Sequence, residues 1–475
     1  MKIEVTEREL GEIDAGLLAV GLAEDGALPP ELADAPGAAA ANGTYKRLST
    51  LLPGSGRVIV AGLGTAADLS PERLRVVAAL VAKEAGSLEV RALAWELPDG
   101  IDPAVAAEAI VTGTVLGSYR YERFRAADPD EPKPEIESLT LVGPAEAGEA
   151  AAAAVIVAAA TNRARDLQST PANFATPSFL AERAEEIAAS QQAVTAEVLG
   201  REAIKEKGMG GLLAVSQGSA EEPRLIVLRY AGGGSGPSLG LVGKGVTFDT
   251  GGISLKPGEG MQKMKYDMSG AAAVLEAVAA IAELGLPVEL LEVLPVTENM
   301  PSGTAIKPGD VITQYNGKTV EVNNTDAEGR LILADALAYA VELGAERLLD
   351  LATLTGAVMV ALGKTYAGLI SNDDELAAAL SAAGEETGEL LWRLPLHPEY
   401  KEMMKGTVAD LSNLASGRDA GTITAASFLE EFVADTPWAH LDIAGTAWGV
   451  GREYTGEDAS GYGVRLLVAL ARALG

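Results

Sequence analysis

Short apolar runs typical of buried β-strands alternate with helical stretches along most of this 475-residue chain. In its second part the strand candidates are residues 225–230, 239–242, 288–294, 319–322, 347–351 and 440–443. Helical stretches lie between them, including residues 271–284, 331–343 and 425–434. Strands that alternate with helices predict an α/β fold, with a mostly parallel central sheet flanked by helices on both faces.

The first part of the chain has the same alternation on a smaller scale. Residues 17–22, 58–63 and 139–143 suit strands, residues 71–86 and 105–120 suit helices, and residues 127–137 are rich in proline and charge. A chain of this length suits two or three domains. We expect residues 1–146 to form a small N-terminal α/β domain, residues 147–167 a connecting helix, and residues 168–475 a larger α/β catalytic domain.

The composition excludes several classes of site. Lys and Arg total 37 against 67 Asp and Glu, which gives a net charge of −30. Such a field repels nucleic acid and anionic membranes, and it favours divalent metals and substrates with a free amine. The absence of cysteine excludes disulfides, thiolate metal sites and cysteine nucleophiles. With only His397 and His440 present, any metal must be held mostly by oxygen ligands.

Neither a secretory signal nor a membrane span is evident in the sequence. Residues 1–5 alternate between charged and apolar side chains and have no apolar signal core. No uncharged run reaches the ~20 residues that a membrane-spanning helix needs. We therefore expect a soluble, cytoplasmic protein without a membrane partner.

The segment 324–331, Asn-Thr-Asp-Ala-Glu-Gly-Arg-Leu, concentrates two carboxylates and a guanidinium within five residues. Asp326 and Glu328 are two apart, so on an extended segment both side chains point to one side. Converging carboxylates repel each other unless a cation or a shared proton lies between them. Gly329 lets the backbone approach a bound group, and Arg330 adds a fixed positive charge.

Further acids and lysines lie upstream in glycine-flanked segments. Lys244 and Asp249 follow the strand candidate 239–242, and Lys256 and Asp267 come before the helix at 271–284. Ligands of open α/β sheets bind beyond the carboxyl ends of the strands. Taken singly, Asp267 suits a helix N-cap and Lys256 a solvated loop charge. Together with the 324–331 segment, these residues are enough for a pair of divalent metals.

These motifs resemble the leucyl aminopeptidase family, the dinuclear-metal cytosolic aminopeptidases. The matching segments are residues 243–252, 256–261, 264–272, 324–331 and 351–357, with further matches at 165–172, 421–428, 438–445 and 461–466. The resemblance covers the chain from about residue 160 to its end. It implies a homohexamer that releases N-terminal amino acids, preferentially Leu and other large apolar residues, from short peptides with a free N-terminus.

The resemblance also implies a role for each site residue. The metal ligands would be Lys244, Asp249, Asp267, Asp326 and Glu328, with Asp249 and Glu328 bridging the two ions. Lys256 and Arg330 would be catalytic without binding metal, and a bicarbonate at Arg330 would shuttle the proton. Mn²⁺ or Zn²⁺ would supply the ions, and two such ions ~3.5–4 Å apart can turn a shared water into the attacking hydroxide.

For the substrate pocket, the resemblance implies a wall around the N-terminal side chain. Its residues would be Met264, Thr353, Leu354, Gly356, Ala444 and Ala447. Met and small residues make a broad apolar pocket that suits Leu or Met. Ordinary core packing is an alternative interpretation for Ala444 and Ala447.

Rival interpretations remain open at this point. Residues 236–240 match the Gly-x-Ser-x-Gly nucleophile elbow, with His440 and Asp442 as partners of Ser238, although Ser238 precedes a strand instead of following one. Residues 240–244 suggest a phosphate loop, but no Ser or Thr follows Lys244. A dinuclear phosphoesterase lacks the expected histidines. A DNA-binding role, known for some members of the family, is disfavoured by the net charge.

Overall fold

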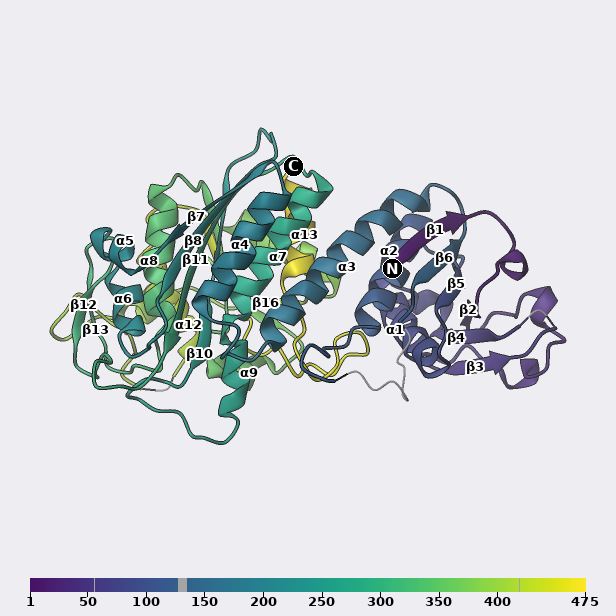
Figure 1. Ribbon diagram of the computed structural model, residues 1–475, viewed down its shortest axis with the longest axis horizontal. Coiled ribbons are helices and arrows are strands. Elements are labelled where there is room, and N and C mark those ends of the chain that lie inside the picture. The colour runs from purple at the N-terminus through teal and green to yellow at the C-terminus, as the bar shows by residue number, and fades with distance from the viewer. Residues whose placement is uncertain (55, 127–134, 418) are drawn as a thin grey trace. The chain divides into compact units, whose positions relative to one another are not determined.

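The computed structural model describes residues 1–54, 56–126, 135–417 and 419–475 (Figure 1). Most of the proline- and charge-rich stretch 127–137 therefore lies outside the described residues. Contacts divide the chain into two compact units. The N-terminal unit comprises Met1–Asn162 and Gly451–Gly456, and the large unit comprises Arg163–Val450 and Glu457–Gly475.

In the N-terminal unit, a sheet of order β1-β6-β5-β2-β4-β3 pairs in parallel except between β3 and β4. Its elements are β1 (Lys2–Thr6), β2 (Leu17–Ala23), β3 (Leu48–Leu51), β4 (Val58–Gly64), α1 (Pro71–Ser87), β5 (Ala92–Glu96), α2 (Pro103–Gly117) and β6 (Ser138–Val142). Both long helices begin with proline at the first helical position, after the N-caps Ser70 and Asp102. Apolar residues of α1 and α2 pack with Trp95 and Leu139 in one core.

The helix α3 (Ala147–Ser169) carries the chain into the large unit. The other elements there, up to the middle of the unit, are α4 (Pro177–Ser190), β7 (Val194–Leu199), α5 (Arg201–Glu206), α6 (Gly210–Ser216), β8 (Arg224–Ala231), β9 (Leu239–Gly243), β10 (Gly245–Asp249), the 3₁₀ helix η5 (Met261–Met268), α7 (Ser269–Leu284) and β11 (Glu289–Asn299). They are followed by β12 (Val311–Thr313), β13 (Thr319–Glu321), α8 (Gly329–Glu342), β14 (Arg347–Ala352), α9 (Gly356–Leu362), β15 (Ala367–Ser371), α10 (Asp374–Thr387), β16 (Leu391–Arg393), α11 (Pro398–Glu402), β17 (Leu411–Ser412), α12 (Gly421–Glu430), β18 (Trp438–Asp442) and α13 (Val464–Leu474).

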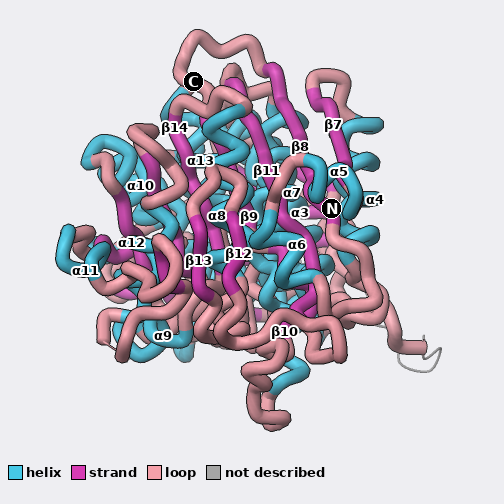
Figure 2. The backbone as a smooth tube through the Cα atoms, turned by 90° about the vertical axis from the view of Figure 1, so that its left-hand side faces the viewer, coloured by secondary structure: helices cyan, strands magenta, loops and turns pink. Residues whose placement is uncertain are grey.

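The main sheet of the large unit has the order β16-β15-β18-β14-β9-β11-β8-β7, and β10 pairs with β11. Its centre, from β18 to β11, is parallel, whereas β15 and β8 pair antiparallel with β18 and β11. Figure 2 shows β11, β8 and β7 side by side, and β9 separates β11 from β14. The helices α6 and α8 cover one face, and α4, α7 and α13 cover the other (Figure 1). The predicted α/β fold with a mostly parallel, helix-flanked sheet is confirmed.

The burial of this sheet explains its sequence. Every residue of β9 and β18 is buried, as expected for parallel strands covered on both faces. On the α8 face, Leu291, Ile332 and Phe428 belong to one continuous hydrophobic core. Burying each such side chain contributes about 1.5–3 kcal/mol to folding. The centre of the sheet therefore forms a rigid base for the loops at its ends.

Three sequence predictions differ from the structure. The predicted strand at 319–322 forms as β13, but it belongs to a separate sheet of order β12-β13-β17. The segment 243–252, expected to be a loop, contains β10. The helix predicted at 425–434 is α12, which follows Ala420 and ends at Glu430, four residues earlier than predicted at both ends. Ala420 and Ala434 both have positive φ, 53° and 49°, a left-handed conformation that does not continue a helix.

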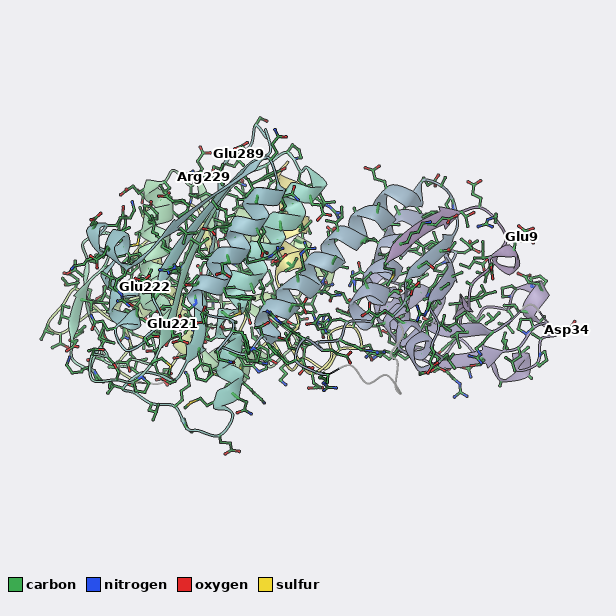
Figure 3. All side chains as sticks on the ribbon, in the orientation of Figure 1. Glu9, Asp34, Glu221, Glu222, Arg229 and Glu289 are labelled. Atoms are coloured by element: carbon green, nitrogen blue, oxygen red, sulfur yellow. The ribbon has the colours of Figure 1, made fainter. Side chains whose placement is uncertain are left out.

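Exposed acidic side chains lie on the surface of both units. Figure 3 labels Glu9 and Asp34 on the N-terminal unit and Glu222 on the large unit, and all three side chains are exposed. Across the parts of the chain that the structure describes, no helix combines the length and the apolar character that a membrane crossing requires.

Candidate metal centre

The expected site residues gather at one edge of the main sheet. Because β9, β14, β18 and β11 run parallel, their carboxyl ends meet at the same edge. Lys244 directly follows β9, Thr353 directly follows β14, and Ala444 lies two residues beyond β18. Asp249 is the last residue of β10 and stands in register with Asn299, the last residue of β11. The site therefore occupies the position where open α/β sheets bind ligands.

Three carboxylates converge there from two separate segments, the end of β10 and the connection that precedes α8. Oxygens of Asp249, Asp326 and Glu328 all lie within 4.8 Å of one another. Asp326 and Glu328 come from the connection between β13 and α8, so this connection reaches the main sheet even though β13 does not belong to it. Such a set of hard oxygen donors suits a divalent cation.

Lys244 links Asp267 to this cluster. Its Nζ lies 2.8 Å from Oδ2 of Asp267 and 2.8 Å from Oε1 of Glu328, and it donates to the carbonyl of Thr353 at 3.1 Å. A Cβ on Gly329 would lie 2.7 Å from Cε of Lys244, so the lysine side chain passes where only glycine leaves room. Gly329 is therefore required by the approach of Lys244, and it does not adopt a positive φ.

Asp267 is not a helix N-cap, the role that its position in the sequence suggested. It lies in η5, and α7 begins after Met268 without a side-chain cap. Oδ1 of Asp267 instead accepts hydrogen bonds from Nζ of Lys244 at 2.9 Å and from Oγ1 of Thr353 at 2.7 Å. Its side chain is thus turned into the carboxylate cluster.

Lys256 closes the more open side of the cluster. Its Nζ lies 2.8 Å from Oδ2 of Asp249 and forms an ion pair with Oδ1 of Asp326. The side chains of Lys256 and Asp326 are 22% and 31% exposed, whereas those of Lys244 and Glu328 are each 3% exposed. Solvent therefore reaches the cluster at Lys256 and Asp326. Lys256 is not a solvated loop charge.

Burial and crowding shift the ionisation of the acids. Burial raises the pKa of Asp267 to about 8, an effect that Lys244 opposes. Burial, reinforced by neighbouring Asp249, also raises the pKa of Glu328. For Lys244, burial alone would lower the pKa, but the carboxylates led by Asp267 and Glu328 outweigh it and raise the pKa. Without a metal, protons and lysine cations neutralise these acids, and this is the charge that divalent ions would replace. The residues present therefore fit a divalent metal site.

Arg330, the second residue of α8, is 5% exposed. Within the described parts of the chain, its Nε and Nη1 have no hydrogen-bond partner. Burial lowers the pKa of Arg330 to about 10, against the opposing effects of Glu328 and Asp442. A buried guanidinium with unused donors is suited to hold an anion.

The expected pocket residues differ in their exposure. Met264 and Leu354 are half-buried, Gly356 is exposed, Thr353 is 6% exposed and Ala444 is 7% exposed. Ala447 is fully enclosed. Leu354 donates its backbone N–H to Oδ1 of Asp442 at 3.2 Å.

Two residues that the sequence analysis did not single out hold the cluster together. Nδ2 of Asn299 donates to Oδ1 of Asp249 at 2.8 Å and to the carbonyl of Thr325 at 3.0 Å. Oγ1 of Thr325 donates to the carbonyl of Gly251 at 2.6 Å. Gly251 has a positive φ of 87°, and a Cβ there would lie 2.8 Å from Oδ1 of Asp326. The available signal for Asn299 was a polar residue at the end of an apolar strand.

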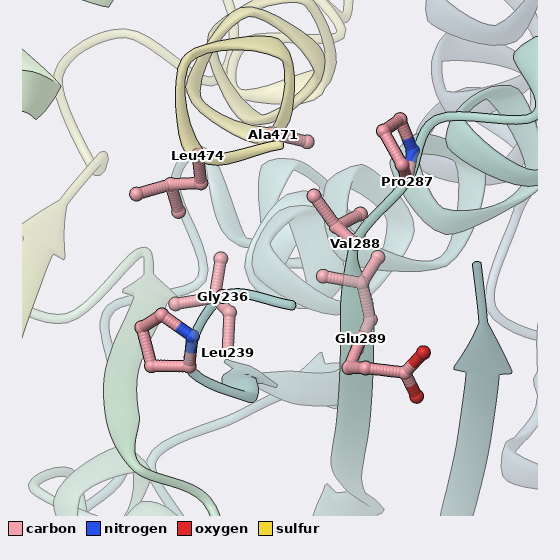
Figure 4. Close-up of a pocket in the computed structure, with 9 residues that line it drawn as sticks. Gly236, Leu239, Pro287, Val288, Glu289, Ala471 and Leu474 are labelled. Carbon is pink, nitrogen blue, oxygen red and sulfur yellow. The ribbon is translucent and has the colours of Figure 1, made fainter. Parts of the chain in front are cut away.

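The serine-hydrolase interpretation is wrong. Ser238 precedes β9 and donates its backbone N–H to Oε2 of Glu346 at 2.8 Å, so it does not stand on a turn between a strand and a helix. His440 is fully buried in β18, and its Nδ1 lies 2.6 Å from Oδ1 of Asp350. The small pocket beside Ser238 is apolar, with the carboxylate of Glu289 turned aside (Figure 4).

The phosphate-loop interpretation also fails. Lys244 lies between two strands, β9 and β10, and not on a loop that opens a helix. Its Nζ is already paired with Asp267 and Glu328, and these carboxylates would repel a phosphate.

Comparisons with known proteins agree with this geometry. Residues 162–468 match the catalytic domain of the cytosol aminopeptidase family, and residues 31–128 match the N-terminal domain of that family. A probable cytosol aminopeptidase of Roseiflexus castenholzii is 45% identical, with 99% of each chain covered. A probable cytosol aminopeptidase of Geobacter sp. (strain M21) is 47% identical, and the match covers 90% of this chain and 88% of the relative's chain.

Two solved structures extend the comparison. The bottromycin maturation enzyme BotP in complex with Mn has a TM-score of 0.89 at 36% identity, covering 97% of this chain and 99% of its own. A tomato leucine aminopeptidase mutant has a TM-score of 0.89 at 36% identity, covering 100% of this chain and 96% of its own. The chain therefore belongs to the cytosol aminopeptidase family and is a metal-dependent aminopeptidase, a hydrolase of peptides.

Proposed function

We propose that this enzyme uses two divalent ions to release N-terminal Leu and other large apolar residues from short peptides. The observation that carries the proposal is the convergence of Asp249, Asp326 and Glu328, joined by Lys244 and Asp267, at the carboxyl edge of the parallel strands. The resemblance to leucyl aminopeptidases gives these residues their roles as ligands.

In this proposal Lys244 and Asp267 would hold one ion and Asp326 the other. Asp249 and Glu328 would serve both ions, and their oxygens lie within 4.8 Å of each other and of an oxygen of Asp326. Mn²⁺ and Zn²⁺ are the preferred candidates, because oxygen donors with one amine suit both ions. The BotP relative was solved with Mn.

The side chains around the ions have complementary tasks. When bound, the ions supply Lewis acidity and turn a shared water into the attacking hydroxide near neutral pH. The acidic site favours the free α-amine of a peptide, which directs the enzyme to N-termini. The ammonium of Lys256 stabilises the oxyanion that develops on the attacked carbonyl, a contribution that can reach several kcal/mol.

Arg330 holds the anion that moves the proton in this proposal. Its unused Nε and Nη1 donors suit a planar oxyanion such as bicarbonate, and its burial keeps that anion from exchanging freely with other solutes. A bicarbonate held by Arg330 would supply the general base, since the described residues of the cluster include no histidine.

The pocket for the N-terminal side chain is assigned to six residues: Met264, Thr353, Leu354, Gly356, Ala444 and Ala447. The half-buried Met264 and Leu354 and the exposed Gly356 are accessible parts of this wall. Ala447 is fully enclosed, so it would not contact the substrate. It would contribute through its small size, which leaves room for the pocket.

The proposal extends to the oligomeric state of the enzyme and its cellular compartment. The resemblance implies a homohexamer whose interior admits short peptides, which light scattering of the purified protein tests. The family description names the cytosol, and we propose the same compartment. The net charge of −30 disfavours nucleic acid as a partner.

A pair of matched substrates tests the exopeptidase activity. Leucine p-nitroanilide should be hydrolysed, whereas N-acetyl-leucine p-nitroanilide, which lacks the free amine, should lose nearly all kcat/KM. The aspartate anilide should be hydrolysed poorly, because its carboxylate would enter an apolar pocket. Equal hydrolysis of the free and acetylated leucine anilides would contradict an N-terminal specificity.

A further inference from the structure

Asn413 is a fully buried asparagine that lies directly after β17, outside every segment that carries a proposed ligand. The strand β17 pairs in parallel with β13 in the small sheet, with Ser412 opposite Glu321. This pairing brings the Asn413 side chain against the connection between β13 and α8. That connection carries Asp326 and Glu328.

The amide of Asn413 is fully used on this connection. Its Oδ1 accepts hydrogen bonds from the backbone N–H of Asn323 at 2.8 Å and of Asn324 at 3.3 Å. Its Nδ2 donates to the backbone carbonyl of Asn324 at 2.7 Å and of Ala327 at 3.3 Å. A primary amide offers two donor hydrogens and two acceptor positions, and all of them are engaged here.

The segment that Asn413 holds carries two of the three carboxylates that converge in the cluster. Asp326 and Glu328 point toward Asp249, and in the metal-free protein they pair with Lys256 and Lys244. The partners of Asn413 are backbone groups on both sides of Asp326, so its hydrogen bonds fix the backbone path and not a ligand oxygen. Asp326 adds a local turn through its own N–H, which donates to Oδ1 of Asn324 at 2.8 Å.

We propose that Asn413 is a positioning residue that keeps the 323–327 connection in its metal-binding conformation before any ion is present. The inference rests on the proposed function, because it assigns Asp326 and Glu328 to the metals. Without this amide, the connection would have to become ordered when the metal binds, and the cost of that ordering would weaken metal binding. Partners that orient metal ligands typically change metal affinity by about 10- to 100-fold when they are removed.

The first test measures Mn²⁺ binding to the metal-free protein by titration calorimetry. Asn413→Ala should bind Mn²⁺ about 10- to 100-fold more weakly than the wild type, and its kcat should approach the wild-type value once Mn²⁺ saturates. Ser371→Ala is the matched control, because the Ser371 hydroxyl is also buried and bridges backbone groups, those of Asp373 and Trp438, away from the cluster. Wild-type affinity in Asn413→Ala would overturn the proposal.

A second variant separates the amide from the space that it fills. Asn413→Asp keeps the size of the side chain and its Oδ1 acceptor, but sets an oxygen against the carbonyls of Asn324 and Ala327. It should weaken Mn²⁺ binding at least as much as Asn413→Ala, because the oxygen at the Nδ2 position repels both carbonyls. Unchanged Mn²⁺ affinity in Asn413→Asp would also overturn the proposal.

A third measurement uses only the wild-type protein and needs no metal. Hydrogen exchange followed by mass spectrometry should show the amides of Asn323 and Asn324 protected in the metal-free state. Rapid exchange that slows only when Mn²⁺ is added would overturn the proposal. Failure of the wild type to bind Mn²⁺ would contradict the proposed function, whereas this exchange measurement would still decide the positioning role of Asn413.

Discussion

Nζ of Lys244 lies 2.8 Å from Oε1 of Glu328, a buried ion pair in which both side chains are 3% exposed. The carboxylates around Lys244 raise its pKa, so the lysine carries its proton in the metal-free protein. A lysine nitrogen can bind a metal only after losing that proton. The pair therefore keeps the site charge-balanced until a metal enters.

Metal binding should accordingly release protons. At pH 7 we expect at least one proton per subunit from Lys244, with more from Asp267, whose pKa is raised to about 8. Mn²⁺ affinity should therefore fall as the pH is lowered from 8 to 6. Calorimetric titrations in buffers with different ionisation enthalpies measure the released protons. Binding without proton release would contradict the assignment of Lys244 as a ligand.

Asp326→Ala should lose metal and activity together, because it removes one of the three carboxylates that converge within 4.8 Å. Metal content after dialysis should fall below two ions per subunit, and the hydrolysis of leucine p-nitroanilide should fall with it. Asp374→Ala is the matched control, since Asp374 is an 89% exposed acid paired with Arg393. Full metal content in Asp326→Ala would refute its role as a ligand.

Lys256→Ala should keep both metals and lose turnover. The lysine lies on the open side of the cluster, where it would face the carbonyl of a bound peptide. Loss of one oxyanion-stabilising donor typically lowers kcat by about 10²- to 10³-fold. Metal analysis alongside steady-state kinetics separates the two effects, and Lys256→Arg should recover part of kcat by restoring a cation. A near-normal kcat in Lys256→Ala would exclude the oxyanion role.

Glu292→Gln should stabilise the protein at high pH. Glu292 is fully buried in β11, and neither of its carboxylate oxygens has a hydrogen-bond partner among the described residues. Burial, with a contribution from Glu276, raises its pKa well above 4.5. A raised folded-state pKa means that the folded state binds more protons than the unfolded state, so the free energy of unfolding falls as the pH rises from the unfolded-state pKa, near 4.5, toward the folded-state pKa.

The glutamine variant removes this pH dependence of the free energy of unfolding, because glutamine does not titrate. Its advantage over the wild type should grow by about 1.4 kcal/mol per pH unit until the pH reaches the folded-state pKa of Glu292. Urea unfolding at pH 5 and pH 8, at one fixed metal concentration, measures the difference in the free energy of unfolding between the variant and the wild type. Glu283→Gln on the exposed side of α7 serves as the control and should show no such trend. Parallel pH profiles for Glu292→Gln and the wild type would disprove the expectation.

The general architecture was predictable because the apolar pattern determines strands and helices and their alternation implies a parallel sheet. The placement of Lys244 and Asp249 at the carboxyl edge of the sheet followed from that rule, since the carboxyl ends of neighbouring parallel strands share an edge. The partner of β13 was not predictable in this way. A short apolar run indicates a strand, but it does not say which sheet the strand joins.

The roles of Asn299 and Asn413 could not be predicted from the sequence, for a related reason. Asn299 and Asn413 act through groups that become their neighbours only after folding, and Asn413 is far along the chain from the connection that it holds. A buried asparagine and a surface asparagine look alike in a sequence. Lys244 and Lys256 could be anticipated as site residues, but their pairing with particular carboxylates could not.

We propose that a divalent metal pair at the Asp249, Asp326 and Glu328 cluster performs the aminopeptidase chemistry. The most direct test of this proposal is the hydrolysis of leucine p-nitroanilide before chelator dialysis, after it, and after Mn²⁺ or Zn²⁺ is added back. We predict that activity disappears on chelation and returns with metal, reaching its maximum at two ions per subunit. Activity that is indifferent to the removal of metal would contradict the account.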